Sequence, residues 1–562
     1  MNMAEETRKC QGCGREFVIE PEDFGFYARM KVPPPTFCPE CRLQSRLAWR
    51  NERALYKRPC DLCRKSVIAM YSPDKPFKVY CLACFNSDKW DPMSYGRDYD
   101  FSRPFFLQFQ ELQHDIPHLA LLQVNMVNSP WCNYETDEKN CYLNFGGHNN
   151  EDSAYNQYAL KAKDTFDTYW FQQGEFGYEA TLSENCYKVF YSKLCYDCRE
   201  AYFSFDCRNC SNIFGCSGLR NKQYHIFNKP VSKEEFESFL KDNLNGSRLR
   251  LEEVKNKVFE SWKSKPQRAV FIERSVNSTG NLVNESRRCS FCWLTEKAED
   301  SKYAMFVLQV KDSYDVTSVW SGELLYEVMG GVEQIANIRF TAGVLEGCTD
   351  IEYSYFIFGS HHCFGSMNLK KEEYCILNKR YTKEDYESLA ARIRKHMDDM
   401  PYTDKVGRVY RYGEFLPFNL SPFAYNETVA YEYFPLKEAE AEKAGLAWGK
   451  YEAEPPVFSG YVIPDDIHEV QDDILEKVLK CEVSGKGYRV IPIELAFYRR
   501  FNIPIPRLAP FERHKRRLRF IADHLKFYSR KCEKCARAVD SVYTAEEFPA
   551  VYCEACYNSE VV

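Results

Sequence analysis

Between residues 126 and 245, apolar and polar positions alternate over short runs and show little helical periodicity. Runs rich in Tyr, Phe, Cys and Asn begin near positions 164, 185 and 206, with a second set near 153, 175, 195 and 216. A repeat of about 21 residues built from short strands is typical of a β-solenoid, in which small polar residues stack between coils. We therefore predict a mainly β fold with a duplicated, right-handed β-helix-like solenoid core. A β-sandwich with irregular loops is the alternative.

The end of this pattern is copied later in the chain. Residues 214–239 align with residues 364–389 at eleven of 26 positions. Each copy leads into a sequence typical of a helix start, Ser232 to Glu235 in one and Thr382 to Asp385 in the other. We expect these helices to cover the end of each solenoid unit, which would otherwise present an unpaired strand edge. The aligned pairs Phe214/Phe364 and Leu219/Leu369 are expected to be buried at equivalent places.

The remaining segments connect these units. Residues 246–263 predict an amphipathic helix with one apolar side made of Leu249, Leu251, Val254, Val258, Phe259 and Trp262. The full domain prediction is tandem zinc ribbons at 1–90, a connector at 91–125, solenoid units with capping helices at 126–245 and 281–395, a helical connector at 246–280, an extended wrapping linker at 396–480, and a degenerate ribbon plus a zinc ribbon at 481–562.

Both ends of the chain carry paired cysteines in C-x2-C motifs. Two such knuckles separated by 17 or 24 residues place four sulfurs around one ion, and four thiolates leave no open coordination position. We therefore predict three structural Zn²⁺ ions and no catalytic one. Their ligands are Cys10, Cys13, Cys38 and Cys41; Cys60, Cys63, Cys81 and Cys84; and Cys532, Cys535, Cys553 and Cys556.

The two ends also match each other at an offset of 471 residues, which indicates a duplicated module. Cys60 falls on this offset with Cys532 of the third site minus one residue, and Phe26 with Phe497. The C-terminal copy of the first ribbon is degenerate, because Cys10 aligns with Cys481 while the other three ligands align with Ser484, Ala509 and Glu512. We expect this copy to fold without metal. The cysteines near residues 186–216 are interpreted as small core residues.

The N-terminal stretch from Cys10 to Phe17, followed by Cys38 to Arg42, resembles the small bacterial "probable zinc-ribbon" family over about residues 8–45. The wider pattern, including Tyr95 to Asp100 and Ser421 to Phe423, resembles large uncharacterised multi-cysteine zinc-ribbon proteins of reduced-genome bacteria. The resemblance implies zinc binding and brings no established activity.

The formal net charge of −6 is unevenly distributed, because residues 1–90 and 482–562 each carry +5 and the middle carries −16. Basic residues recur at helical steps beside both terminal ribbons, which is typical of a phosphate-binding face. A solvated face and a clamp on the acidic middle are the alternatives. The candidates for nucleic-acid or partner contact are Arg42, Arg46, Arg50, Arg53, Lys57, Arg513, Lys515, Arg516, Arg517 and Arg519.

Eight carboxylates are duplicated between the two solenoid units and are the only enzyme candidates: Asp164, Asp167, Glu175, Glu179, Asp312, Asp315, Glu323 and Glu327. Paired carboxylates are what glycoside cleavage needs, but retention in both copies favours a structural role. The chain has neither an eighteen-residue apolar run nor the apolar stretch of a signal peptide, so we expect a cytoplasmic protein without membrane contact. The sequence favours a non-enzymatic, zinc-stabilised scaffold that binds another macromolecule. An RNA- or DNA-binding protein and a carbohydrate-active β-helix enzyme are the alternatives.

Overall fold

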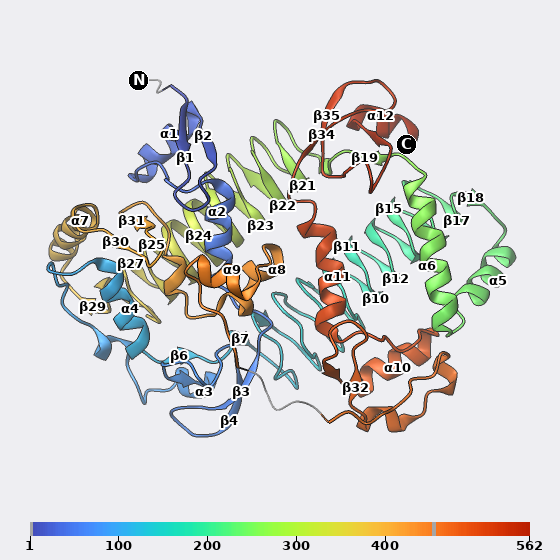
Figure 1. The fold of residues 1–562 in the computed structure, drawn as a ribbon, viewed down its shortest axis with the longest axis horizontal. Coiled ribbons are helices and arrows are strands. Elements are labelled where there is room, and N and C mark those ends of the chain that lie inside the picture. Colours follow the sequence, from blue (N-terminus) through green and yellow to red (C-terminus); the bar gives the residue numbers. More distant parts are fainter. Residues whose placement is uncertain (1–3, 452–456, 562) are drawn as a thin grey trace. The chain divides into compact units, whose positions relative to one another are not determined.

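The computed structural model describes residues 4–451 and 457–561, which form two compact units (Figure 1). Unit 1 combines residues 4–121 with 271–451, and unit 2 combines residues 122–270 with 457–561. Each unit therefore joins one terminal module to one stack of parallel strands. We call the stacks the first repeat stack (residues 122–228, unit 2) and the second repeat stack (residues 271–378, unit 1). Strands hold more of the described residues than helices do, so the predicted mainly β class is confirmed.

The first repeat stack is built from parallel strands whose partners lie twelve residues apart. Glu175 is paired with Tyr187, and Thr181 with Lys193. Isolated bridges continue the same step towards the N-terminus, as in Tyr142 with Ala154. The predicted repeat of about 21 residues is therefore wrong, and the coil has twelve. Its strands are β7 (Gln123–Val124), β8 (Glu135–Thr136), β9 (Tyr169–Gln172), β10 (Glu175–Tyr178), β11 (Thr181–Glu184), β12 (Tyr187–Phe190), β13 (Lys193–Tyr196), β14 (Arg199–Tyr202), β15 (Phe205–Arg208), β16 (Ser211–Phe214), β17 (Gln223–Ile226) and β18 (Lys229–Pro230).

Each coil turns a corner at every third residue. From Leu182 to Asn209, every third residue has a φ angle between 47° and 58°, although none of them is glycine. The left-handed conformation costs an L-residue roughly 1–2 kcal/mol. The interior positions follow the same period, because every third residue from Ala180 to Cys216 is at most 3% exposed. Most of these interior residues are Ala, Ser or Cys, which fit a narrow space between strands.

Interior hydroxyl groups supply hydrogen bonds that the strands leave open. The backbone N–H of Ser204 donates to the Ser192 hydroxyl one coil earlier, at 2.9 Å, and the Ser192 hydroxyl donates to the carbonyl of Phe190 at 2.9 Å. Interior Asn150 acts in the same way, because its side-chain oxygen accepts from the N–H of Ala162 at 3.0 Å. These bonds satisfy buried backbone groups that would otherwise be unpaired, and so help offset the strain of the corners.

The second repeat stack repeats this architecture. Trp293 is paired with Met305 and Thr349 with His361, again twelve residues apart, whereas Ala336 and Thr349 are thirteen apart. Its strands are β20 (Ile272–Glu273), β21 (Gly280–Asn284), β22 (Cys292–Glu299), β23 (Met305–Lys311), β24 (Tyr314–Leu345), β25 (Thr349–Glu352), β26 (Tyr355–Phe358), β27 (His361–Phe364), β28 (Glu373–Ile376) and β29 (Lys379–Arg380).

A helix follows the last coil of each stack. Helix α5 (Lys233–Asn243) is capped by the Ser232 hydroxyl, and helix α7 (Lys383–Asp399) by the Thr382 hydroxyl. Both helix starts are as predicted, and Phe214, Phe364 and Leu369 are fully buried. Leu219 is only partly buried against its core.

Helix α6 (Arg248–Lys263) follows α5. It buries Leu251, Val254, Val258 and Trp262 as predicted. Leu249 and Phe259 were placed on the same apolar side, and this is wrong, because they are 70% and 48% exposed.

The two terminal modules contain corresponding elements. The N-terminal module has β1 (Glu6–Lys9), β2 (Glu16–Ile19), α1 (Pro21–Met30), α2 (Pro39–Leu47), β3 (Tyr56–Pro59), β4 (Ser66–Ala69), β5 (Val79–Tyr80) and α3 (Leu82–Phe85). The C-terminal module has β32 (Leu479–Lys480), β33 (Gly487–Tyr488), α10 (Pro492–Phe501), α11 (Pro510–Ala522), β34 (Tyr528–Lys531), β35 (Ala538–Ser541), β36 (Val551–Tyr552) and α12 (Glu554–Val561).

Each module also binds a strand that precedes a repeat stack. In unit 1, β5 pairs in parallel with β6 (His118–Leu119), which follows helix α4 (Phe105–Asp115). In unit 2, β36 pairs in parallel with β19 (Gln267–Arg268). The predicted wrapping linker at 396–480 contributes β30 (Tyr402–Thr403), β31 (Val409–Tyr410), α8 (Val429–Tyr433) and α9 (Glu438–Lys443) to unit 1, and its residues 452–456 lie outside the described residues.

Candidate metal centres

Three groups of four cysteines form at the places that the sequence predicts. Within each group, all four sulfur atoms lie within 4.8 Å of one another. The groups are Cys10, Cys13, Cys38 and Cys41; Cys60, Cys63, Cys81 and Cys84; and Cys532, Cys535, Cys553 and Cys556. This arrangement fits tetrahedral coordination of one ion by four thiolates, the usual geometry of a structural zinc site.

A tight turn and a helix start bring the sulfurs of each group together. In the first ribbon, the N–H of Cys10 donates to the carbonyl of Arg15 at 2.8 Å, and the N–H of Gly14 donates back to Cys10 at 2.9 Å. The second pair of cysteines begins helix α2, where the N–H of Cys38 donates to the sulfur of Cys10 at 3.2 Å. The backbone therefore sets the cysteine positions before any ion binds.

The same backbone donors favour the thiolate form. Burial raises the pKa of Cys60, but the N–H groups of Cys63 and Cys81 outweigh it and lower that pKa to about 6. Cys532 has the same surroundings, and its pKa is also lowered to about 6. Since metal ligation requires the thiolate, these groups are prepared to bind a cation near neutral pH.

The degenerate ribbon keeps the turn without the ligands. The N–H of Cys481 donates to the carbonyl of Lys486 at 2.9 Å, and Gly485 donates back to Cys481 at 3.0 Å. Both bonds match those of the first ribbon. Cys481 is 1% exposed, and Ala509 directly precedes helix α11 where Cys38 precedes α2. A single buried thiol remains at this place, so packing holds the ribbon.

The basic residues predicted to contact a partner divide into buried and exposed groups. Arg42 and Arg46 lie on α2 and are 3% and 0% exposed. A Nη of Arg42 lies 2.8 Å from the Asp315 carboxylate, and Arg46 lies 2.8 Å from Glu327 and 3.1 Å from Asp315. Burial raises the pKa of Glu327, and the positive charge of Arg46 opposes this shift.

Unit 2 contains the corresponding cluster. Arg513 and Arg517 on α11 lie 3.3 Å and 2.9 Å from Asp167, which is fully buried. Arg513 also lies 2.9 Å from Glu494 of α10. Burial raises the pKa of Asp167, and both arginines act in the opposite direction. The sequence comparison missed Glu494, although the offset of 471 places it opposite Asp23.

These contacts correct the predicted interface. Because Arg42, Arg46, Arg513 and Arg517 are buried, they are removed from any surface that a phosphate could reach in this fold. Arg50 is also buried and contacts Glu52 at 2.5 Å, while Arg53 lies 3.8 Å from Glu432. The half-buried Lys515 pairs with Glu512 at 3.2 Å. The exposed members of the predicted set are Lys57, Arg516 and Arg519.

The duplicated carboxylates divide in the same way. Asp167 and Asp315 are fully buried against arginines, and Glu327 is 1% exposed. The half-buried Glu179 has its pKa lowered by Lys255 and Arg517 despite the effect of burial. The outer members pair on the surface, with Asp312 at 3.0 Å from Arg29 and Glu323 at 3.7 Å from Lys311. Asp164 and Glu175 are half-buried.

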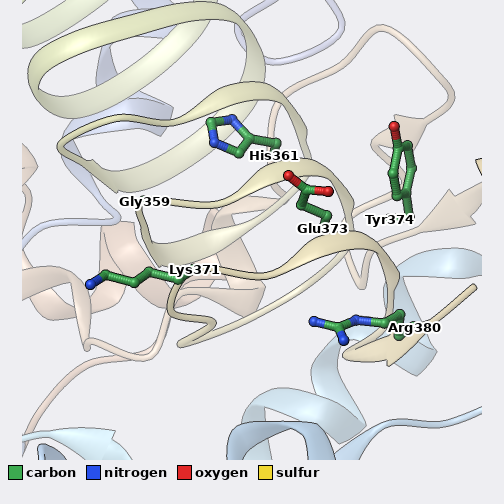
Figure 2. A pocket seen from close by; sticks show the side chains of 6 residues that line it. All are labelled: Gly359, His361, Lys371, Glu373, Tyr374 and Arg380. Atoms are coloured by element: carbon green, nitrogen blue, oxygen red, sulfur yellow. The ribbon is translucent and has the colours of Figure 1, made fainter.

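The second repeat stack carries a cavity of about 460 Å³ (Figure 2). It is lined by Gly359, His361, Lys371, Glu373, Tyr374 and Arg380. Lys371, Glu373 and Arg380 are exposed, and Nδ1 of His361 lies 2.7 Å from the Thr349 hydroxyl. Arg380 is paired with Glu372. The equivalent positions in the first stack are Asn209, Ser211, Asn221, Gln223, Tyr224 and Pro230, so the charges belong to one copy.

Comparison with known proteins adds no identification. No protein-family model matches the chain, and a search of curated proteins finds no significant relative. No helix among the described residues is both long and apolar enough to cross a membrane.

Proposed function

We propose that this protein is a non-enzymatic, zinc-stabilised scaffold that binds another protein. The observation that carries the proposal is the paired use of charge in the two units. Arg42 with Asp315 and Arg513 with Asp167 are buried ion pairs between a terminal module and the repeat stack of the same unit. Charged residues that would suit catalysis or phosphate binding are thus occupied in joining modules.

Two further proposals concern the parts of the scaffold. Each repeat stack is a β-solenoid, which the parallel pairing at twelve residues and the three-residue corner period support. The ions of the three cysteine groups are Zn²⁺, because a tetrathiolate site suits this ion best. Free cysteines throughout the chain fit a reducing compartment such as the cytoplasm.

The carbohydrate-active alternative loses its main support. Glycoside cleavage needs two carboxylates on an open face. The duplicated residues Asp167 and Asp315 are fully buried and neutralised by arginines. The nucleic-acid alternative retains only Lys57, Arg516 and Arg519 as exposed members of its predicted contacts.

Capture of the full chain from its native cells tests the proposal. A protein partner should stay bound after nuclease treatment and in moderate salt. Replacing the exposed Lys57, Arg516 and Arg519 with alanine should leave this capture unchanged. Binding that disappears with nuclease and weakens in the triple variant would instead support a nucleic-acid partner.

A further inference from the structure

One coil of the first repeat stack has an interior unlike the others. Its four inward positions are Cys132, Glu135, Glu138 and Cys141, spaced three residues apart and at most 2% exposed. From Asn144 to Cys216, every third residue of the same interior series is neutral. Strand β8 of this coil pairs with β7, the first strand of the stack, so the coil lies close to the N-terminal end of the stack.

The two carboxyl groups of this coil interact with each other. Glu138 forms a side-chain hydrogen bond with Glu135, and burial raises the pKa of Glu138. Its oxygens also accept from the side chains of Asn150, at 2.7 Å, and Asn144, at 3.1 Å. Every one of these partners is neutral or acidic. Two buried carboxylates in contact are strongly unfavourable unless a proton or a cation stands between them.

The surroundings leave room above Glu135 and keep both thiols close. Gly147 lies one coil further on, and a Cβ atom there would meet Glu135 Oε2 at 3.1 Å and the carbonyl of Ala159 at 2.1 Å. The negative charges of Glu135 and Glu138 add to burial in raising the pKa of Cys132. Cys141 responds to Glu138 and Cys132 in the same way. A cation would reverse these shifts, because a coordinating thiol is deprotonated.

The second repeat stack provides an internal comparison. At the offset of 148 residues that aligns Asp167 with Asp315, the four inward positions become Gly280, Val283, Ser286 and Cys289. Val283 and Ser286 are as deeply buried as the glutamates that they replace. A coil of this kind therefore closes without inward carboxylates, and the two glutamates are not required by the fold.

We propose a fourth metal site inside the first repeat stack, which binds one divalent transition-metal ion of the zinc type through Cys132, Glu135, Glu138 and Cys141. Two sulfurs and two carboxylate oxygens are ligands that Zn²⁺ accepts. Binding releases the two thiol protons and any proton held between the carboxyl groups, so it strengthens as pH rises. The donor atoms are less closely gathered than those of the ribbons. Ligation therefore requires the carboxylates to exchange their asparagine partners for the ion.

Metal analysis of the full chain, purified under reducing conditions with Zn²⁺ supplied, tests this site. We expect four ions per chain. The double variant Glu135→Val and Glu138→Ser, which introduces the residues of the second stack, should hold three. The matched change Cys289→Ser in the second stack should leave four, and Cys10→Ser should lose one ion from a ribbon while keeping the interior one.

An anomalous-scattering measurement at the zinc edge on crystals of the unmodified protein decides the case even if the double variant does not fold. A peak between Cys132, Glu135 and Glu138 is the expected result. Three ions per chain with all three peaks in the ribbons would overturn the proposal, since the carboxyl pair would then hold a shared proton instead.

Discussion

Arg42 and Asp315 meet at 2.8 Å in the interior of unit 1, and their side chains are 3% and 0% exposed. The residue 471 positions after Arg42 is Arg513, and the residue 148 positions before Asp315 is Asp167. These two also meet, at 3.3 Å, in unit 2. The same ion pair therefore joins a terminal module to a repeat stack in both units. A contact that recurs at both sets of positions is a property of the shared architecture.

Asp315→Asn should destabilise the protein strongly. The change leaves Arg42 and Arg46 with one carboxylate between them, and a buried charge without its partner costs about 3–5 kcal/mol. Thermal or urea unfolding of unit 1 would measure the loss.

The surface pair of Arg29 and Asp312 provides the control for this variant. Arg29 is 53% exposed, so Asp312→Asn should cost at most about 1 kcal/mol. Equal losses from the two variants would mean that the interior pair contributes no more than a surface contact, and the joining role would have to be abandoned.

Cys60→Ser should remove one metal ion and unfold the second ribbon locally. The repeat stacks make their own hydrogen bonds between coils, so their circular dichroism should remain nearly unchanged. Cys481→Ser is the matched change in the degenerate ribbon, where no ion is expected, and the metal content should stay constant. A loss of metal from the Cys481 variant would show that this ribbon also takes part in binding.

The three cysteine groups were predictable because their spacing alone specifies the chemistry. Knuckles such as Cys60 and Cys63 are local turns, and a second knuckle 17 residues later suffices to complete a site. The helix starts at Lys233 and Lys383 were predictable for the same reason, since Ser232 and Thr382 cap them through neighbouring residues.

The coil length was not predictable from the periods used. Tests for periods of 2 and 3.6 residues miss a chain that turns at every third residue, as at Lys188 and Tyr191. The apparent spacing of 21 is a multiple of three, so it aligned like positions without marking the twelve-residue coil. The series of small residues from Ala180 to Cys216 was the available signal.

The fate of the arginines required knowledge of the tertiary structure. Arg42 and Arg46 are four residues apart, as on a solvated helix face, and nothing local indicates that Asp315 covers them. Sequence separation of about 270 residues hides the partner. Only the joint retention of both carboxylates and arginines in two copies pointed towards a clamp.

Stability should fall between pH 7.5 and pH 5.0 because of His118. Burial lowers the pKa of His118 from 6.5 to about 4, and its Nε2–H donates to the carbonyl of Gln113 at 2.8 Å. Below pH 6.5 the unfolded chain binds a proton there that the folded chain does not, so folding loses free energy until the folded pKa is reached. The linkage amounts to about 2 kcal/mol over this interval.

Urea unfolding at the two pH values measures this effect as a difference. His118→Gln should reduce the pH dependence by that amount, whereas His114→Gln, at an exposed position of α4, should leave it unchanged. If the two variants respond to pH alike, His118 does not control stability in this range.

Ser192→Ala should destabilise the first repeat stack although it removes one oxygen atom. The Ser192 hydroxyl accepts from the N–H of Ser204 at 2.9 Å and donates to the carbonyl of Phe190. Alanine leaves the buried N–H without an acceptor, which costs about 1–3 kcal/mol. The control is Ser211→Ala on the outer, half-buried side of β16, which should change stability by less than about 0.5 kcal/mol. Hydrogen exchange at the Ser204 amide should accelerate in the first variant alone, and unchanged protection there would show that interior hydroxyls do not hold successive coils together.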